Sequence, residues 1–139
     1  MRMMTNNANK IGSEREILFK DLSYALIGAA FEVFNELGWG LSEKAYQAAL
    51  EKELHRRSIN FKREVYIPLD YKSERIGRYF ADFVIEEKVL LELKVVSRLG
   101  YVHAKQVLGY LKSSKIKLGI LLYFTREGVK YRRVINSSI

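Results

Sequence analysis

Apolar and polar residues alternate or cluster in stretches that predict β-strands. Residues 61–71, FKREVYIPLDY, alternate in polarity, and the apolar runs at 79–85 and 89–96 flank a short charged turn. Two such runs joined by a tight turn are typical of an antiparallel hairpin. The run at 116–124, IKLGILLYF, is almost wholly apolar, as in a strand covered on both faces. VKYRRVI, which follows Gly128, predicts a further, amphipathic strand at the end of the chain.

Three other segments carry apolar residues at helical spacing. The first begins at Asp21, the expected N-cap, and stops at Gly38. A second helix starts near Ser42 with Glu43 in its first turn, and a third, YVHAKQVLGYLKSS, follows Gly100. The elements therefore follow the order α-α-β-β-β-α-β, with the further strand at the end. This order predicts an α/β fold in which helices flank a mixed β-sheet.

Length and composition predict one domain without a membrane span. The chain has 139 residues, which suits a single core; we expect residues 1–15 to form a disordered polar tail and residues 16–139 to form the domain. No apolar run approaches the roughly 20 residues that cross a bilayer. The absence of cysteine excludes disulfides, zinc–thiolate sites and thiol catalysis, and it fits a cytoplasmic location.

The charge of the chain is strongly basic and unevenly distributed. The formal net charge is +8. Between residues 88 and 117 the only acidic residue is Glu92, and the basic residues are Lys88, Lys94, Arg98, Lys105, Lys112, Lys115 and Lys117. Clustered cations bind phosphate backbones without reading base sequence. We therefore expect a nucleic-acid partner; the alternative is a charge that only keeps the chain soluble.

Three charged residues interrupt the two apolar runs of the predicted hairpin. A tight turn near Glu87 sets Asp82 opposite Glu92 to within about one residue of register. Glu92 and Lys94 share a strand face because they are two residues apart. Charges in a central strand are costly unless they are paired or bind metal, and two close carboxylates attract a hard divalent cation. The pattern predicts a metal-dependent hydrolase, with an ordinary solvated ion pair as the alternative.

The element order, with D…ExK on adjacent strands, resembles the PD-(D/E)XK nuclease superfamily and its restriction-endonuclease-like fold. Residues 40–46, GLSEKAY, match the G-x-x-E-x-x-Y pattern of the GxxExxY family. The likeness runs from about Leu22 to Phe124. It includes ADFVI around Asp82, LLELK around Glu92 and AKQVLGYLK around Gln106.

The resemblance implies a metal centre and a lysine that assists catalysis. Asp82 and Glu92 would bind Mg²⁺ or Mn²⁺ together with the backbone carbonyl of Leu93. Lys94 would position the attacking water and stabilise the transition state. Hard oxygen donors suit these cations, whereas zinc sites favour cysteine and histidine. Ala81 replaces the proline of the superfamily's name, a departure that is frequent among its members.

Three further residues join the expected site through the same resemblance. Glu43 resembles an additional acid that the first helices supply in several branches. Gln106 and Tyr110 resemble the Q-x-x-x-Y element of the recombination-nuclease branch, and their spacing of four places them on one helix face. Without the resemblance, we would interpret Gln106 as a surface residue and Tyr110 as a half-buried core residue.

These features together predict a Mg²⁺-dependent nuclease that hydrolyses phosphodiester bonds, with DNA as the expected substrate. The chain contains no G-x-S-x-G, P-loop or H-E-x-x-H motif for a competing mechanism. Two alternatives stay open: a non-catalytic module that binds nucleic acid or a protein partner, and a subunit that is active only in a larger complex. A homodimer or a partner protein would add surface for recognition to so small a domain.

Overall fold

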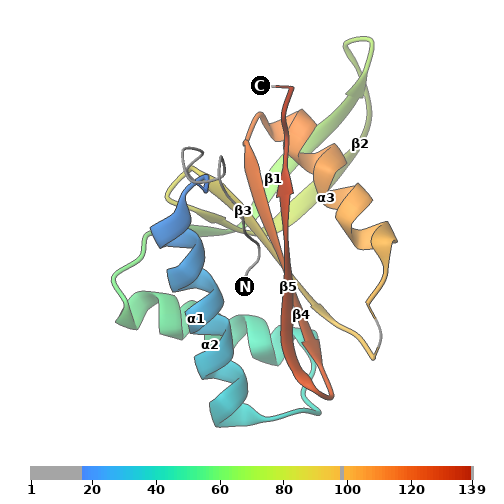
Figure 1. Cartoon of the computed structure of the whole chain (residues 1–139). Helices are drawn as coiled ribbons and strands as arrows, with labels where there is room; N and C mark the ends of the chain where they lie inside the picture. The colour runs from blue at the N-terminus through green and yellow to red at the C-terminus, as the bar shows by residue number, and fades with distance from the viewer. Residues whose placement is uncertain (1–16, 98, 139) are drawn as a thin grey trace.

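Helices flank a five-stranded sheet in the computed structural model, which describes residues 17–97 and 99–138 (Figure 1). In chain order the elements are α1 (Lys20–Leu37), α2 (Glu43–Arg56), β1 (Phe61–Tyr71), β2 (Glu74–Ile85), β3 (Val89–Val95), α3 (Tyr101–Ser114), β4 (Leu118–Thr125) and β5 (Gly128–Ile135). The predicted α/β class and element order are confirmed, including the strand at the end. The tail expected at residues 1–15 lies outside the described residues.

The sheet is mixed because one connection crosses over it. Its strand order is β1-β2-β3-β4-β5, and every neighbouring pair is antiparallel except β3 and β4. A parallel pair needs a long crossover, and α3 supplies it. The central strand β3 is buried from Val89 to Leu93, which explains why its sequence is apolar on both faces.

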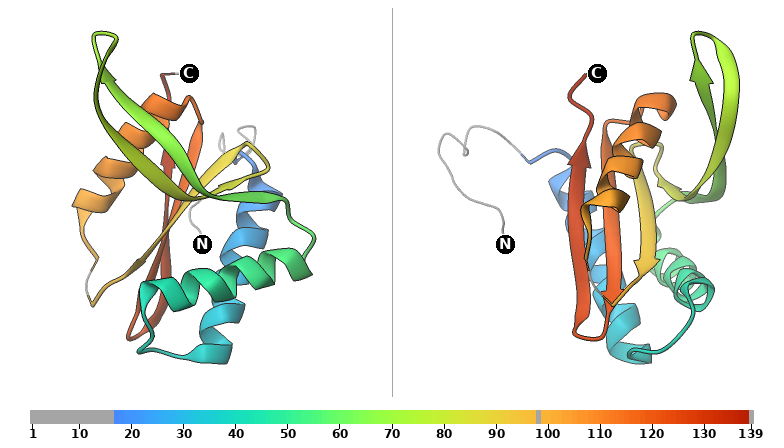
Figure 2. Two further views of the ribbon diagram at one scale, coloured as in Figure 1. Left: turned by 180° about the vertical axis from the view of Figure 1, so that it is seen from behind. Right: turned by 90° about the vertical axis from the view of Figure 1, so that its right-hand side faces the viewer.

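Two hydrophobic cores lie on opposite faces of the sheet. The helices α1 and α2 cover one face, and α3 covers the other (Figure 2). Fully buried residues of the first core include Leu26, Leu50, Phe83, Leu91 and Phe124. The second core is smaller and includes Ala81, Leu90, Leu111 and Leu121. Among the described helices, none combines the length and the apolar character needed to span a bilayer.

Two element boundaries differ from the sequence prediction. Phe19, not Asp21, is the N-cap of α1; it has left-handed backbone angles and makes no side-chain capping bond. Phe19 packs against the first core, so tertiary contacts fix this helix start, and Asp21 lies in the first turn, where the helix dipole favours an acid. Strand β4 begins at Leu118 rather than at residue 116, because Lys115 ends α3 in a left-handed conformation and the chain must still turn into the sheet.

The β1–β2 hairpin extends beyond the sheet. Strand β2 pairs with β1 along nearly its whole length but with β3 only over Phe83–Ile85. Glu64 of β1 has a positive φ of 49° next to this point, where the hairpin turns away from the sheet. Figure 2 shows the hairpin projecting past the other strands. The hairpin thus separates from β3 at Asp82, which opens one edge of the central strand.

Candidate active site

Two carboxylates take the place of the missing strand partner where β2 leaves β3. The backbone N–H of Leu93 donates to Asp82 Oδ2 at 2.9 Å, and the N–H of Asp82 donates to Glu92 Oε2 at 2.8 Å. Each acidic side chain therefore bonds the backbone beside the other acid, which holds Asp82 and Glu92 in fixed positions. The register Phe83↔Leu91, extended by one residue, places them opposite each other, as the hairpin prediction expected.

Glu43 reaches the same edge of β3 from the start of α2. The Ser42 hydroxyl accepts a hydrogen bond from the Ala45 N–H at 3.1 Å and so caps this helix, as the sequence predicts. Glu43 Oε1 accepts a hydrogen bond from the N–H of Val95 at 3.2 Å. Val95 is two residues beyond Leu93, so Glu43 binds the next N–H along the edge at which Asp82 is bound.

The G-x-x-E-x-x-Y pattern fixes the loop that delivers Glu43. Tyr46 is fully buried, and its hydroxyl donates to the carbonyl of Gly38 at 2.5 Å and accepts from the N–H of Leu41 at 3.3 Å. Gly40 has a φ of 117°, which a residue with a side chain rarely adopts. The glycine and the tyrosine of the pattern therefore shape one turn, and the glutamate is the group that this turn presents to β3.

Burial and nearby acidic charges, that of Glu43 for Asp82 and that of Asp82 for Glu92, disfavour the charged forms of the two central acids. Only 3% of Glu92 is exposed. Its burial, and then the charge of Asp82, raise the pKa of Glu92 to about 7. Burial also raises the pKa of Asp82, opposed by the Leu93 N–H and by the cations Lys94 and Arg63. The Lys94 ammonium lowers the pKa of both acids, so all three predicted central residues interact electrostatically.

Helix α3 brings Tyr110 near these acids but leaves Gln106 in solvent. Tyr110 stacks on Tyr79 of β2, with the two rings 13° from parallel. Burial and the charge of Glu92 raise the pKa of Tyr110 and, more strongly, that of Tyr79. Gln106 is exposed. Of the two residues predicted on α3, the tyrosine therefore joins the acidic cluster, and the glutamine lies on the open surface.

Two residues that the sequence did not single out also belong to this neighbourhood. Arg63 Nε donates to the carbonyl of Asp82 at 3.1 Å, and its other nitrogens bind Glu51 at 2.7 Å and Gln47 at 3.3 Å. Tyr79 has a buried hydroxyl beside Glu92, and its interaction with that carboxylate lowers the pKa of Glu92. The pairing of β1 with β2 sets Arg63 opposite Phe83, but this register shifts at Leu69 and Asp70, so spacing along the chain provided no signal for Arg63.

The donor set suits a hard divalent cation without forming a complete metal cage. Within the described residues, no three histidine, cysteine or acidic side chains gather closely enough to hold a metal. Asp82 and Glu92 supply two adjacent carboxylates, and a cation between them would favour the charged forms that burial and neighbouring acids disfavour. The carbonyl of Leu93 points to the same open edge as its N–H, because both groups of a strand residue face one neighbour. These oxygens fit Mg²⁺ or Mn²⁺.

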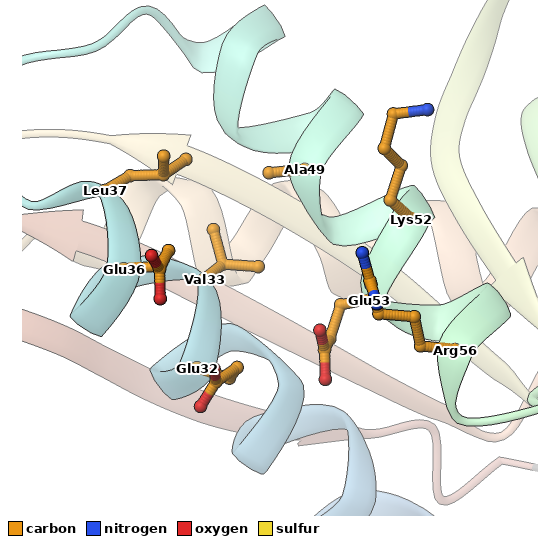
Figure 3. Close-up of a pocket in the computed structure, with 8 residues that line it drawn as sticks. All are labelled: Glu32, Val33, Glu36, Leu37, Ala49, Lys52, Glu53 and Arg56. Atoms are coloured by element: carbon orange, nitrogen blue, oxygen red, sulfur yellow. The ribbon is translucent and has the colours of Figure 1, made fainter.

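A separate hollow of about 540 Å³ lies between α1 and α2 (Figure 3). Acidic, basic and apolar side chains line it: Glu32, Val33, Glu36, Leu37, Ala49, Lys52, Glu53 and Arg56. None of the predicted site residues is among them. The chemistry that the sequence predicts therefore lies at the open edge of β3 and not in this hollow.

Comparison with known proteins agrees with this architecture. The solved structure titled "Crystal structure of SSO0001" is similar, with a TM-score of 0.53 at 21% sequence identity. The match covers 66% of this chain and 48% of that chain, so the chain spans about half the length of that structure, and the likeness concerns the fold. No curated protein matches the chain significantly.

A family model described as the PD-(D/E)XK nuclease superfamily matches residues 20–134, from the start of α1 into β5. The mixed sheet flanked by helices is the restriction-endonuclease-like fold expected for that superfamily. Because the match spans most of the chain, this protein belongs to the PD-(D/E)XK nuclease superfamily.

Proposed function

We propose that this chain is a divalent-metal-dependent nuclease that hydrolyses phosphodiester bonds, with DNA as its substrate. The observation that carries the proposal is the cross-bonded pair of Asp82 and Glu92 at the open edge of β3, with Lys94 acting on both. A buried acid in the central strand, Glu92, with a second, partly buried acid beside it on β2, weakens the fold unless it is paired or binds a cation, and this cost supports a functional role. Membership of a nuclease superfamily supports the same conclusion.

In this proposal Asp82, Glu92 and the Leu93 carbonyl hold the Mg²⁺ or Mn²⁺ ion. Glu43, bonded to Val95 N–H, stands next to them and supplements the metal site. The bound cation supplies Lewis-acid neutralisation of the phosphate oxygens and lowers the pKa of water. The backbone bonds to the carboxylates keep their oxygens in place, so little reorganisation is needed when substrate binds.

Lys94 acts on the attacking water and on the charge that develops at phosphorus. Lys94 is partly exposed and lies on the same strand face as Glu92. From there its ammonium can donate hydrogen bonds to the attacking water and to the phosphate oxygens. Tyr110 packs against Tyr79 beside Glu92 and limits the movement of that carboxylate. Gln106 is exposed on α3, where its amide can bind the substrate backbone. The Q-x-x-x-Y and G-x-x-E-x-x-Y patterns support a relationship to the recombination-nuclease branch and the GxxExxY family.

The decisive experiment is cleavage of single- and double-stranded DNA and RNA in Mg²⁺, Mn²⁺ or EDTA. We compare the wild type with Asp82→Asn, which keeps an acceptor for Leu93 N–H, and with Lys94→Ala. Each variant should lose at least about 100-fold in kcat, the scale of removing one group that stabilises developing charge. Lys52→Ala, an exposed lysine of α2 in the hollow away from the candidate site, is the matched control and should cut like the wild type.

Metal titration by calorimetry, run in parallel, distinguishes the nuclease proposal from the binding-module and complex-subunit alternatives. A nuclease should bind Mg²⁺ or Mn²⁺ through Asp82, and Asp82→Asn should weaken that binding. A folded wild type that binds nucleic acid but neither binds metal nor cuts would overturn the proposal in favour of a binding module. Metal binding without cutting would instead favour a subunit that needs a protein partner, which a pull-down with the tagged chain would recover.

A further inference from the structure

The β1–β2 hairpin carries an exposed pair of aromatic side chains. Tyr66 and Phe80 are direct partners in the antiparallel ladder, and their ring centroids are 5.7 Å apart at an angle of 64°. The two residues are 47% and 48% exposed. No described element therefore covers the pair.

Two arginines surround this pair and hold it in place. Arg75 Nη1 donates to the Tyr66 hydroxyl at 2.7 Å, and its Nε binds Asp70 at 2.6 Å. The Arg78 guanidinium lies 5.9 Å from the centre of the Phe80 ring. The hairpin thus presents two oriented rings with positive charge beside them, and no large rearrangement is needed before a ligand can bind.

The opposite face of the hairpin already gives it a packed core. Val65, Ile67, Tyr79 and Ala81 pack in the core that α3 completes. A cross-strand aromatic pair also stabilises a two-stranded hairpin, and that is the simplest structural reason for Tyr66 and Phe80. It does not explain why cations are placed beside both rings in a region that solvent reaches.

The pair lies close to the candidate active site along the strand. Phe80 precedes Asp82 by two residues, which corresponds to roughly 6–7 Å along β2. A nucleic-acid strand that is bound at the carboxylates and continues along β2 would reach the rings. Base faces are hidden inside a duplex, whereas unpaired bases can stack on aromatic side chains and their phosphates can bind arginine.

We propose that Tyr66 and Phe80, with Arg75 and Arg78, form a base-stacking surface that selects single-stranded nucleic acid at this site. The inference rests on the proposed nuclease function, which it makes more specific. Stacking on an aromatic side chain contributes about 1–3 kcal/mol per base and depends little on base identity, so the surface favours unpaired strands without strong sequence preference.

The test measures binding of the full chain in EDTA, where no cleavage occurs. Fluorescence anisotropy compares a labelled oligothymidylate with an oligonucleotide of equal length that has the same backbone but no bases. The wild type should bind the base-bearing strand at least about tenfold more tightly, the effect of stacking one to two bases. Tyr66→Leu/Phe80→Leu keeps apolar side chains but no rings, and the ratio should fall close to one. Phe31→Leu, an exposed aromatic on α1, is the matched control and should keep the wild-type ratio.

Each other outcome overturns the inference. An unchanged ratio in a folded double variant would leave the pair a purely structural contact, and lower thermal stability of that variant would agree with it. A wild-type ratio of one would mean that only phosphates are bound, and the nuclease proposal would stand. If the wild type bound neither strand in EDTA, the stacking inference would fail, and the nuclease proposal would be decided by the cleavage experiment with metal. An unchanged ratio with a dimer lost on substitution, seen by sedimentation, would assign the surface to a second copy of the chain.

Discussion

Glu92 is a carboxylate in the central strand of the sheet, and its environment opposes its charge. Burial and the nearby Asp82 raise its pKa to about 7, whereas the Tyr79 hydroxyl, the Asp82 N–H and Lys94 act in the other direction. The favourable contacts thus fall short of the desolvation cost. The residue that the proposal assigns to the metal is therefore one that weakens the metal-free fold at neutral pH.

This imbalance predicts how the stability of the metal-free protein depends on pH. The pKa of Glu92 is raised from 4.5 to about 7 on folding, so the folded state binds the proton more tightly than the unfolded state. The contribution of Glu92 to stability is then full below its unfolded pKa and is lost as the pH rises toward 7. Above pH 7, Glu92→Gln should be more stable than the wild type by about 1–3 kcal/mol, whereas near pH 4 the two should be similar.

Urea denaturation in EDTA at pH 4 and pH 8 measures this difference. Glu32→Gln, an exposed acid on α1, is the matched control and should follow the wild type at both pH values. If Glu92→Gln and the wild type lost equal stability between the two pH values, the predicted role of the Glu92 carboxylate would be wrong.

At the scale of elements, local signals predicted most boundaries, and long-range contacts decided the others. Ser42 and Glu43 form a helix start through bonds within one turn, so the sequence alone identifies it. The start of α1 depends on Phe19 packing against a core made by distant strands, and no local rule supplies that contact. The fold class followed from the element order, because the helix between β3 and β4 crosses over the sheet and so makes these two strands parallel.

The candidate site was predictable only where it lies on one hairpin. The tight hairpin turn predicted Asp82 opposite Glu92; the ladder ends one residue earlier, at Phe83 and Leu91, and side-chain-to-backbone hydrogen bonds bring the two acids together. The contributions of Arg63 and Tyr79 depend on how β1 pairs with β2 and on how α3 docks on the hairpin. Spacing in the sequence carries neither piece of information, so these two residues appear only in three dimensions.

The loop before α2 gives a prediction about positioning. Tyr46→Phe removes the hydroxyl that bonds Gly38 and Leu41, and the loop that presents Glu43 should become less well fixed. Given the proposed nuclease activity, kcat should fall about tenfold with KM little changed, and the free energy of unfolding should fall by about 1 kcal/mol. Cleavage kinetics and thermal melting measure the two effects. Tyr24→Phe on the surface of α1 is the control, and a loss of stability without a change in kcat would limit Tyr46 to a structural role.

At the scale of the whole molecule, α3 joins the site to the second core. Its residues Val107 and Leu111 pack on the sheet over Gly119 of β4, and Tyr110 of the same helix stacks on Tyr79 beside Glu92. The distance between α3 and the sheet therefore affects both the packing of the second core and the position of Tyr110 beside the site. Gly119 allows this close approach, since it presents no side chain to α3.

Gly119→Ala should push α3 away from the sheet. A Cβ atom at this position would lie 2.7 Å from Val107 Cγ1 and 3.4 Å from both methyl carbons of Leu111. The branched valine has few rotamers with which to move aside, so the helix must shift, and the free energy of unfolding should fall by about 1–3 kcal/mol. Gly109→Ala on α3 is the matched control: its Cβ would meet nothing within 4 Å, and alanine should stabilise the helix by about 0.5–1 kcal/mol. Urea denaturation measures both variants, and equal stability of Gly119→Ala and the wild type would show that α3 is not held this closely against the sheet.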